Sequence, residues 1–310
     1  MELLIWPSGF GLPSADPQSL AFLACVKFCA APVQVRKLAP SVLPWGTPKA
    51  LPLFRHGDGM QLEEFSHFAA YLRRQLPDLS LDSHLDEEQL AALPAYRALI
   101  HEHLRPAYLY SFWMDTPNYN AITNIWYGKH LPIPFSLHYT TQRRRAAIAS
   151  LRTLFPGDLV SELDLEFATV RRAKAAMNLF DARLSTSKYL FGDKPSSADG
   201  LLFGYLAMMQ RSPLVRDQLA AHLNGCQNLL RFLDAVHSIY LPLTPKEEFP
   251  LQNKLWFAIT AVFLTALAAV HFGIIQVEVE EGVEKEDGQE IRAKLPPEMD
   301  FDGIIGASSE

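Results

Sequence analysis

Cysteine is scarce in this chain: Cys25, Cys29 and Cys226 are the only three in 310 residues. A small, odd number of cysteines in a chain of this length excludes a disulfide-stapled scaffold and indicates a reducing compartment. Cys25 and Cys29 lie four residues apart in an apolar segment. Redox and zinc motifs have a two-residue gap instead, so we expect these two thiols to be small buried core groups.

Basic residues are missing from the amino terminus. The first is Lys27, which follows Glu2 and Asp16. Secretory and mitochondrial leaders need early basic residues, so we expect neither kind of leader. Positive charge is not concentrated elsewhere either. Residues 276–310 contain eleven acidic and three basic residues, so the formal charge of −6 leaves +2 for residues 1–275. This balance excludes a nucleic-acid partner, which would require clustered basic residues.

Motifs for phosphate or metal chemistry are also lacking. The sequence contains no Gly-rich phosphate loop and no His-Glu-x-x-His motif. His101 and His103 flank Glu102, but alternate positions on a helix point about 200° apart and cannot share one metal ion. We therefore expect no metal and no cofactor.

Charged side chains are absent from residues 255–275, LWFAITAVFLTALAAVHFGII, although they make up 20% of the chain. A helix of this length spans about 31 Å, which matches a hydrocarbon core of about 30 Å. A helix buried in a soluble core would normally show a polar stripe, and this one has none. We therefore expect a membrane anchor, with lipid-facing side chains that include Leu255, Trp256, Phe263, Leu267 and Ile275.

The position of this span predicts the topology. A single span so near the carboxyl end enters a membrane only after most of the chain has been made, so the preceding body should fold in the cytosol. Lys246 and Lys254 flank the near side, whereas acidic residues begin the far side, a bias that agrees with a cytosolic body. The acidic tail has few aromatic residues and should be disordered.

The first part of the chain has the pattern of an α/β unit. MELLIW reads as a strand, the helical periodicity of QSLAFLACVKFCAAP follows a Pro- and Gly-rich loop, and VQVRKL reads as a second strand. A short strand containing Pro52, a turn at residues 57–59, another strand and a helix from about Glu63 follow. Proline in a strand loses a ladder hydrogen bond, so Pro52 should lie at an edge or follow a cis peptide.

Two features resemble the glutathione transferase superfamily. In its thioredoxin-like half a cis-proline precedes a strand, a turn and the last helix, and Leu51–Pro52 is similar to that element. Helical periodicity dominates after about residue 80, where FGDKPSSADGLLFGYLAMM contains a capping box. In that box the side chain of Ser196 accepts from the backbone three residues on, and Asp199 accepts from the backbone of Ser196. The box resembles the folding signature of the superfamily's helical domain.

The same resemblance marks a pocket that has lost its usual chemistry. Active members place an acidic or amide residue and then Ser at the start of the last thioredoxin-domain helix, and the matching positions here are Glu64 and Phe65. Phe65 has no hydroxyl with which to hold glutathione. An activating residue is expected after the first strand, where Ser8 stands between Pro7 and Gly9, a context typical of a turn. The vestigial-pocket candidates are Trp6, Ser8, Pro52, Glu64 and Phe65.

A second resemblance covers most of residues 1–275. The phrases MELLIWPSGFGLPS, FWMDTPNY, IWYGKHLPIPFSL, FGDKPSSADGLLFGYLA and HLNGCQNLLRFLDAVHSIYLP occur in this order and are similar to the metaxin family. Metaxins are members of the superfamily that lie on the mitochondrial outer membrane and face the cytosol, and the tail-anchored subclass is the most similar. The resemblance implies a non-enzymatic role in the sorting and assembly machinery, beside the β-barrel insertase.

Several residues carry the metaxin phrases and are candidates for partner contacts: Trp113, Asp115, Asn118, Tyr119, Trp126 and Tyr127. A simpler interpretation stays open. Aromatic clusters between helices usually form core, and Asp and Asn beside a proline usually cap or turn the chain. The basic run at residues 143–145 has two interpretations as well, a solvated helix face or a contact with lipid headgroups.

These observations predict a fold of the class α/β plus α. The expected parts are a thioredoxin-like domain at 1–78, a helical domain like the C-terminal domain of glutathione transferases at 79–245, a linker at 246–254, the transmembrane anchor at 255–275 and the acidic tail at 276–310. The partners implied by the resemblance are an insertase subunit, a second metaxin-type subunit, β-barrel precursors and the lipid bilayer. The alternatives are a membrane-anchored glutathione transferase and a tail-anchored adaptor for other cytosolic cargo.

Overall fold

The computed structural model describes residues 1–38, 51–57, 59–75, 81–131, 135–155 and 161–244, together with Val262, Thr265 and Ala269. Met1–Trp256 form one compact unit. The predicted linker, the tail and the five named anchor residues Leu255, Trp256, Phe263, Leu267 and Ile275 lie outside the described residues. Across the described ranges, no helix is both long enough and apolar enough to cross a bilayer.

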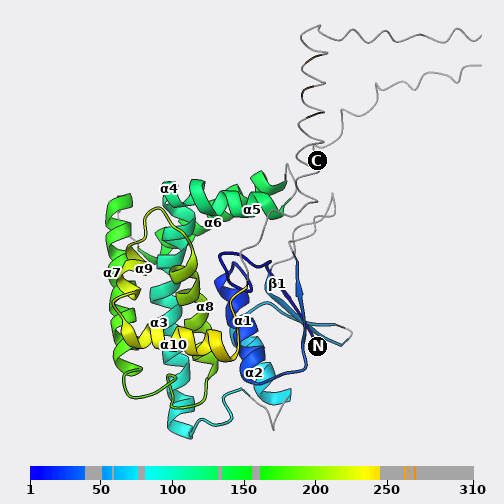
Figure 1. Cartoon of the computed structure of the whole chain (residues 1–310), viewed down its shortest axis with the longest axis vertical. Coiled ribbons are helices and arrows are strands. Elements are labelled where there is room, and N and C mark those ends of the chain that lie inside the picture. Colours follow the sequence, from blue (N-terminus) through cyan, green and yellow to red (C-terminus); the bar gives the residue numbers. More distant parts are fainter. Residues whose placement is uncertain are drawn as a thin grey trace, which may run out of the picture. The chain divides into compact units, whose positions relative to one another are not determined.

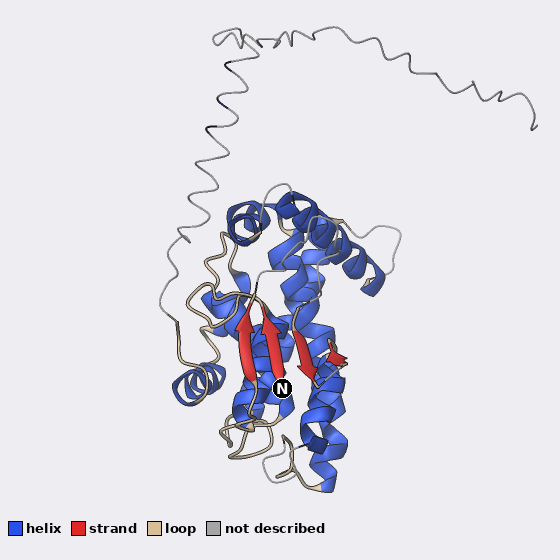
Figure 2. Ribbon diagram, turned by 90° about the vertical axis from the view of Figure 1, so that its right-hand side faces the viewer, coloured by secondary structure: helices blue, strands red, loops and turns tan. Residues whose placement is uncertain are grey.

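A four-stranded mixed sheet forms the first part of the unit, and Figure 2 shows its strands side by side. The strand order is β2-β1-β3-β4, in which β1 is parallel to β2 and antiparallel to β3, and β3 is antiparallel to β4. Leu3 of β1 pairs with Val35 on one side and Phe54 on the other. The strands are β1 (Glu2–Ile5), β2 (Gln34–Lys37), β3 (Leu53–His56) and β4 (Met60–Leu62).

The burial of each strand follows its sequence. In β1 the run Leu3, Leu4 and Ile5 is buried, as an unbroken apolar run predicts for an inner strand. The more polar edge strands β2 and β4 remain largely exposed. The predicted succession of four strands and two helices is confirmed, in the order βαβββα, with one correction. Pro52 does not lie within the third strand but directly before it, after a cis peptide bond, so β3 loses no ladder hydrogen bond to it.

Helix α1 (Pro17–Phe28) lies between the sheet and helix α8 (Ser197–Arg211), as Figure 1 shows. Its sequence PQSLAFLACVKF has apolar residues on every side, which is the composition of a helix buried all round. On one flank Phe22 stacks on Phe68 of helix α2 (Phe65–Gln75), with ring centroids 4.2 Å apart. The three cysteines are free and buried, as predicted for Cys25 and Cys29.

The contact between α1 and α8 depends on two glycines of α8. A Cβ atom on Gly204 would overlap the carbonyl oxygen of Pro17 and lie 3.1 Å from the backbone nitrogen of Ala21. A Cβ atom on Gly200 would lie 2.7 Å from Sγ of Cys25. The two helix backbones can approach this closely only because both positions lack a side chain.

The rest of the described unit is helical. Apolar side chains from the sheet, α1, α2 and these helices join in one large core cluster, so a single core supports both parts of the unit. Besides α8, the helical elements are α3 (Glu87–Leu109), η1 (Tyr110–Met114), α4 (Thr116–Asn118), η2 (Tyr119–Thr123), α5 (Asn124–His130), α6 (Phe135–Leu154), α7 (Glu162–Arg183), α9 (Gln218–Leu223) and α10 (Gln227–Ile239).

Candidate functional site

The residues of the FWMDTPNY phrase lie in an irregular helical run that joins α3 to α5. In this run the short helix α4 stands between two π-helical turns, η1 and η2. π-helical turns are rare and are frequent at functional sites, because the wider turn redirects side chains. Two of them within fourteen residues, Tyr110–Thr123, identify this run as the most unusual backbone among the described helices.

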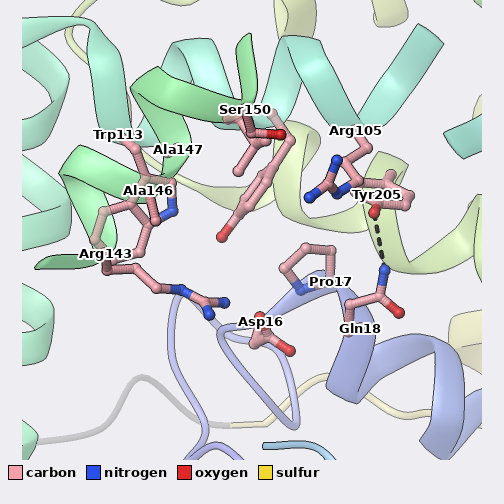
Figure 3. A pocket seen from close by; sticks show the side chains of 12 residues that line it. Asp16, Pro17, Gln18, Arg105, Trp113, Arg143, Ala146, Ala147, Ser150 and Tyr205 are labelled. Carbon is pink, nitrogen blue, oxygen red and sulfur yellow. Dashed lines mark hydrogen bonds between the residues drawn. The ribbon is translucent and has the colours of Figure 1, made fainter. Parts of the chain in front are cut away.

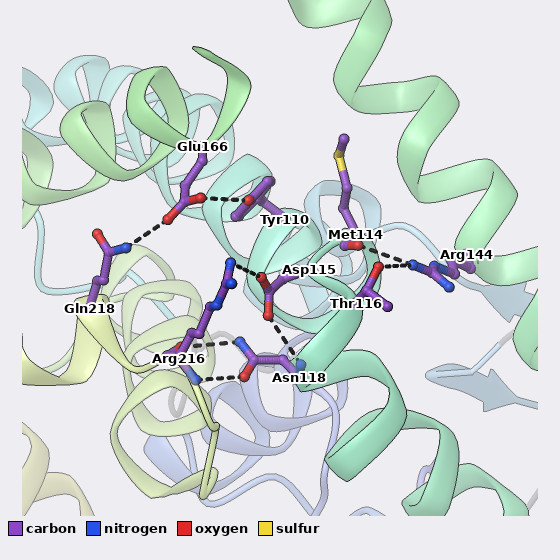
Figure 4. A network of polar contacts seen from close by, with 9 residues as sticks. All are labelled: Tyr110, Met114, Asp115, Thr116, Asn118, Arg144, Glu166, Arg216 and Gln218. Atoms are coloured by element: carbon purple, nitrogen blue, oxygen red, sulfur yellow. Dashed lines mark hydrogen bonds and ion pairs between the residues drawn. The ribbon is translucent and has the colours of Figure 1, made fainter. Parts of the chain in front are cut away.

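Polar side chains fix the centre of the run to the loop before α9 (Figure 4). Asp115 caps α4 by accepting a hydrogen bond from the backbone N–H of Asn118 at 3.1 Å, and it pairs with the guanidinium of Arg216 at 3.3 Å. Asn118 makes two bonds to the backbone of Arg216: its Nδ2 donates to the carbonyl at 3.1 Å, and its Oδ1 accepts from the N–H at 2.8 Å. Asp115 thus has the capping role that its position beside Pro117 indicates.

A second set of bonds connects the run to the neighbouring helices (Figure 4). Tyr110 donates to Glu166 of α7 at 2.9 Å, and Gln218 of α9 donates to the other oxygen of Glu166 at 2.6 Å. On the opposite side Arg144 of α6 donates to the carbonyl of Met114 and lies 4.3 Å from the ring centroid of Tyr119. The irregular backbone is therefore held by α6, by α7 and by the loop before α9.

The aromatic residues of the family phrases meet the end of β1 in one cluster. The Trp6 ring lies 5.0 Å from that of Tyr127 and 6.0 Å from that of Trp126, both edge to face, and Trp113 lies 5.1 Å from Tyr127. A Cβ atom on Gly9 would overlap Nε1 of Trp126, so this glycine permits the close approach. The cluster therefore forms the seam between the sheet and the helices.

Every one of the partner candidates is buried. Their exposed fractions range from 1% to 8%, and the six residues are Trp113, Asp115, Asn118, Tyr119, Trp126 and Tyr127. In the described unit their contacts are with other residues of the chain. This placement agrees with the simpler interpretation of core and capping residues.

The vestigial-pocket candidates make contacts of different kinds. Ser8 is buried, and its hydroxyl accepts a hydrogen bond from Nζ of Lys37 at 3.0 Å. Glu64 is exposed and pairs with His67 one helical turn away. Pro52 is buried before β3, and Trp6 belongs to the aromatic cluster.

Phe65 occupies the space where the superfamily resemblance places a serine hydroxyl. Its ring packs edge to face on Phe22 at 5.8 Å and lies under the guanidinium of Arg97 at 5.7 Å. The side chain is only 8% exposed, so it is a core residue. At this point the described structure offers hydrocarbon to a ligand, not a hydroxyl.

The capping box of α8 is confirmed and is fully buried. The backbone N–H of Asp199 donates to Oγ of Ser196 at 3.4 Å, and the N–H of Ser196 donates to Asp199 at 2.8 Å. Asp199 accepts two further bonds, from the hydroxyl of Ser196 at 2.6 Å and from the N–H of Leu190 at 2.9 Å. Burial nevertheless raises the pKa of Asp199 to about 6, because desolvation outweighs these donors.

Sequence reasoning missed two partners of these residues. Arg216 lies 98 positions from Asn118, and no local pattern indicates that the two meet. The contact of Trp6 with Trp126 and Tyr127 is equally long-range. The family phrases indicate which segments matter, but they do not indicate which of these segments contact one another.

Comparison with known proteins places this architecture in a family. A family model described as an outer mitochondrial membrane transport complex protein matches residues 19–144, and one described as the C-terminal domain of glutathione S-transferase matches residues 173–236. A β-etherase structure from Sphingobium superposes with a TM-score of 0.50 at 18% identity, covering 76% of this chain and 94% of that one. The glutathione-transferase-like fold is thereby confirmed.

Relatives that match most of the chain support the same family placement. A Metaxin-1 homolog of Caenorhabditis briggsae is 36% identical over 323 residues, covering 91% of this chain and 99% of that one. Metaxin-1 of Macaca fascicularis is 34% identical, covering 81% and 78%, and Metaxin-3 of Xenopus laevis is 34% identical, covering 77% and 76%. The predicted resemblance is confirmed, and the chain belongs to the metaxin family, a family of outer mitochondrial membrane transport complex proteins.

Proposed function

We propose that this protein is a non-catalytic scaffold and receptor subunit of the sorting and assembly machinery of the mitochondrial outer membrane. In this role its cytosolic body contacts the β-barrel insertase and a second metaxin-type subunit and assists the insertion of β-barrel precursors. The observation that carries the proposal is family membership combined with Phe65, which fills the place of a glutathione-binding serine with a buried ring.

The buried seam supports a scaffold role. A partner surface must keep its shape, and the irregular run from Tyr110 to Thr123 is held by bonds from α6, α7 and the loop before α9. We propose that the family-phrase residues serve partner binding indirectly, by fixing this run and the faces next to it. Interfaces bind tightly when their surfaces are preorganised, because less conformational freedom is lost on association.

Residues 255–275 complete the proposal as a single membrane anchor. Their lack of charge and their length support a span, and the anchor would hold the body near its partners at a raised effective concentration. The expected topology is single-pass, with the body in the cytosol.

Deletion of residues 254–310 is expected to release the protein from mitochondria, because it removes the apolar span. The full chain should stay in the membrane pellet after alkaline carbonate extraction and should co-purify the insertase from detergent-solubilised mitochondria. Retention of the shortened chain in the pellet would contradict the anchor. A full chain that stays in the pellet but repeatedly fails to retain the insertase would favour an adaptor for other cargo.

Glutathione is expected not to bind the purified full chain in calorimetry, because Phe65 provides no hydroxyl. Phe65→Ser is the informative variant, since it restores the hydroxyl that the superfamily resemblance places there, and Ser8→Ala tests the remaining nucleophile candidate. Micromolar to low-millimolar binding by the unaltered chain, with thiol transfer that disappears in Ser8→Ala, would establish the membrane-anchored transferase instead.

A further inference from the structure

A cavity of about 150 Å³ opens at the amino-terminal end of α1, between that helix and α3, α6 and α8. It is separate from the vestigial pocket, because none of the five residues predicted for that pocket lines it. One residue of the seam, Trp113, also lines it.

Two arginine side chains reach into the cavity from opposite sides, Arg105 from α3 and Arg143 from α6 (Figure 3). Within the described part of the chain, neither guanidinium forms an ion pair with a carboxylate. Arg97 shows the usual arrangement for comparison, since its guanidinium lies 3.5 Å from the buried carboxylate of Asp82. The two guanidinium groups provide planar sets of donors suited to an oxyanion, and the nearby charge of Asp16 attracts that of Arg143.

Asp16 sets the charge that a ligand would need. Its buried carboxylate lies at the floor of the cavity and caps α1, accepting from the N–H of Ser19 at 2.7 Å. Burial raises the pKa of Asp16, and the guanidinium of Arg143 opposes that rise. With Asp16 ionised, the two arginines and one carboxylate leave the lining with one net positive charge. A ligand with a single negative charge is complementary to it, whereas a dianion would be repelled by Asp16.

The remaining lining limits the size and polarity of the ligand. Pro17, Leu109 and Ala147 provide apolar surface, and Ser150 adds a hydroxyl. The volume corresponds to about five water molecules at about 30 Å³ each, well below the roughly 300 Å³ at which drug-sized ligands begin to fit. A short hydrocarbon tail behind a charged head matches this space.

We propose that this cavity binds a small organic monocarboxylate, whose carboxylate is held between Arg105 and Arg143 and whose short apolar tail lies against Pro17 and Ala147. The site is independent of the proposed assembly role, and it differs in place and lining from the pocket that Phe65 fills. The chain would thus carry a small-molecule site at the junction of its two parts.

The test is a calorimetric titration of the full chain in detergent micelles with sodium butyrate. Butyrate should bind saturably, and butyramide, which has nearly the same shape without the charge, should not. Arg105→Gln and Arg143→Gln should each weaken butyrate binding about 10-fold or more, because each removes a charge-assisted partner. Arg145→Gln, a change on the same helix at a residue that does not line the cavity, should leave binding unaltered.

Three results would overturn the proposal: no saturable butyrate binding, equal binding of butyramide, or unchanged affinity in both cavity variants. Inorganic phosphate that binds more tightly than butyrate would contradict the single-charge argument and indicate a phosphate site. The butyrate and butyramide comparison uses the unaltered chain, so it decides the matter even where a variant fails to fold. Circular dichroism of each variant identifies that failure.

Discussion

Asp199→Ala is expected to lower the free energy of unfolding by about 3 kcal/mol, because it removes one half of the capping box and leaves buried N–H groups without acceptors. The carboxylate of Asp199 accepts from the N–H groups of Leu190 and Ser196 and from the hydroxyl of Ser196, and none of these residues reaches solvent freely. The measurement is chemical denaturation of the full chain in detergent, followed by circular dichroism.

Asp86→Ala is the matched control. Asp86 and Gln89 form the same kind of box at the start of α3, but there the bonds are exposed to water. Water replaces the lost acceptor, so this variant should cost about 1 kcal/mol or less. Equal losses in the two variants would show that burial does not amplify the box.

The contribution of Asp199 should also depend on pH. Its folded-state pKa of about 6 lies above the ordinary aspartate pKa of 3.8, so the folded protein holds this proton more tightly than the unfolded chain. The resulting stabilisation is complete below pH 3.8 and is lost as the pH rises through about 6. The stability difference between the unaltered chain and Asp199→Ala should therefore shrink across this window.

Gly204→Ala is expected to destabilise the protein by about 3 kcal/mol, since the new methyl group must push α8 away from α1. The group would overlap the carbonyl of Pro17, which belongs to rigid backbone and cannot rotate aside. The loss should appear in the same denaturation experiment, and both helices should still form in the folded variant.

Gly128→Ala is the matched control, and we expect it to cause no loss of stability. Gly128 lies in α5, and a Cβ atom there would meet nothing within 4 Å. Alanine favours a helix over glycine by up to about 1 kcal/mol, so this variant should be as stable as the unaltered chain or slightly more stable. A comparable loss in both glycine variants would refute the close-packing argument for Gly204.

Features that depend on neighbours in sequence could be predicted from the sequence. The succession of four strands and two helices follows from periodicity and turn residues, and the Ser196–Asp199 box follows from a four-residue spacing. The cis peptide before Pro52 followed from the superfamily resemblance, whereas the position of that proline relative to the strand was off by one residue. Strand ends depend on pairing, which a single segment does not reveal.

Features that depend on distant segments could not be predicted. Tyr110–Met114 and Tyr119–Thr123 read as ordinary helix in sequence, and their π-helical turns arise where a long helical run must fit several neighbours. Arg143 is exposed, as the interpretation of a solvated basic run predicts, but its place beside a cavity with Arg105 of another helix could not be predicted. The predicted span at 255–275 rests on composition alone and lies outside the described residues.

The placement of α1 has a consequence for how this architecture can change over time. The apolar helix α1 packs against both the sheet layer and the helical layer. Recombination that replaced either layer with an unrelated one would expose about half of the apolar surface of α1 to water. The two layers are therefore bound to be inherited together, as a single heritable piece.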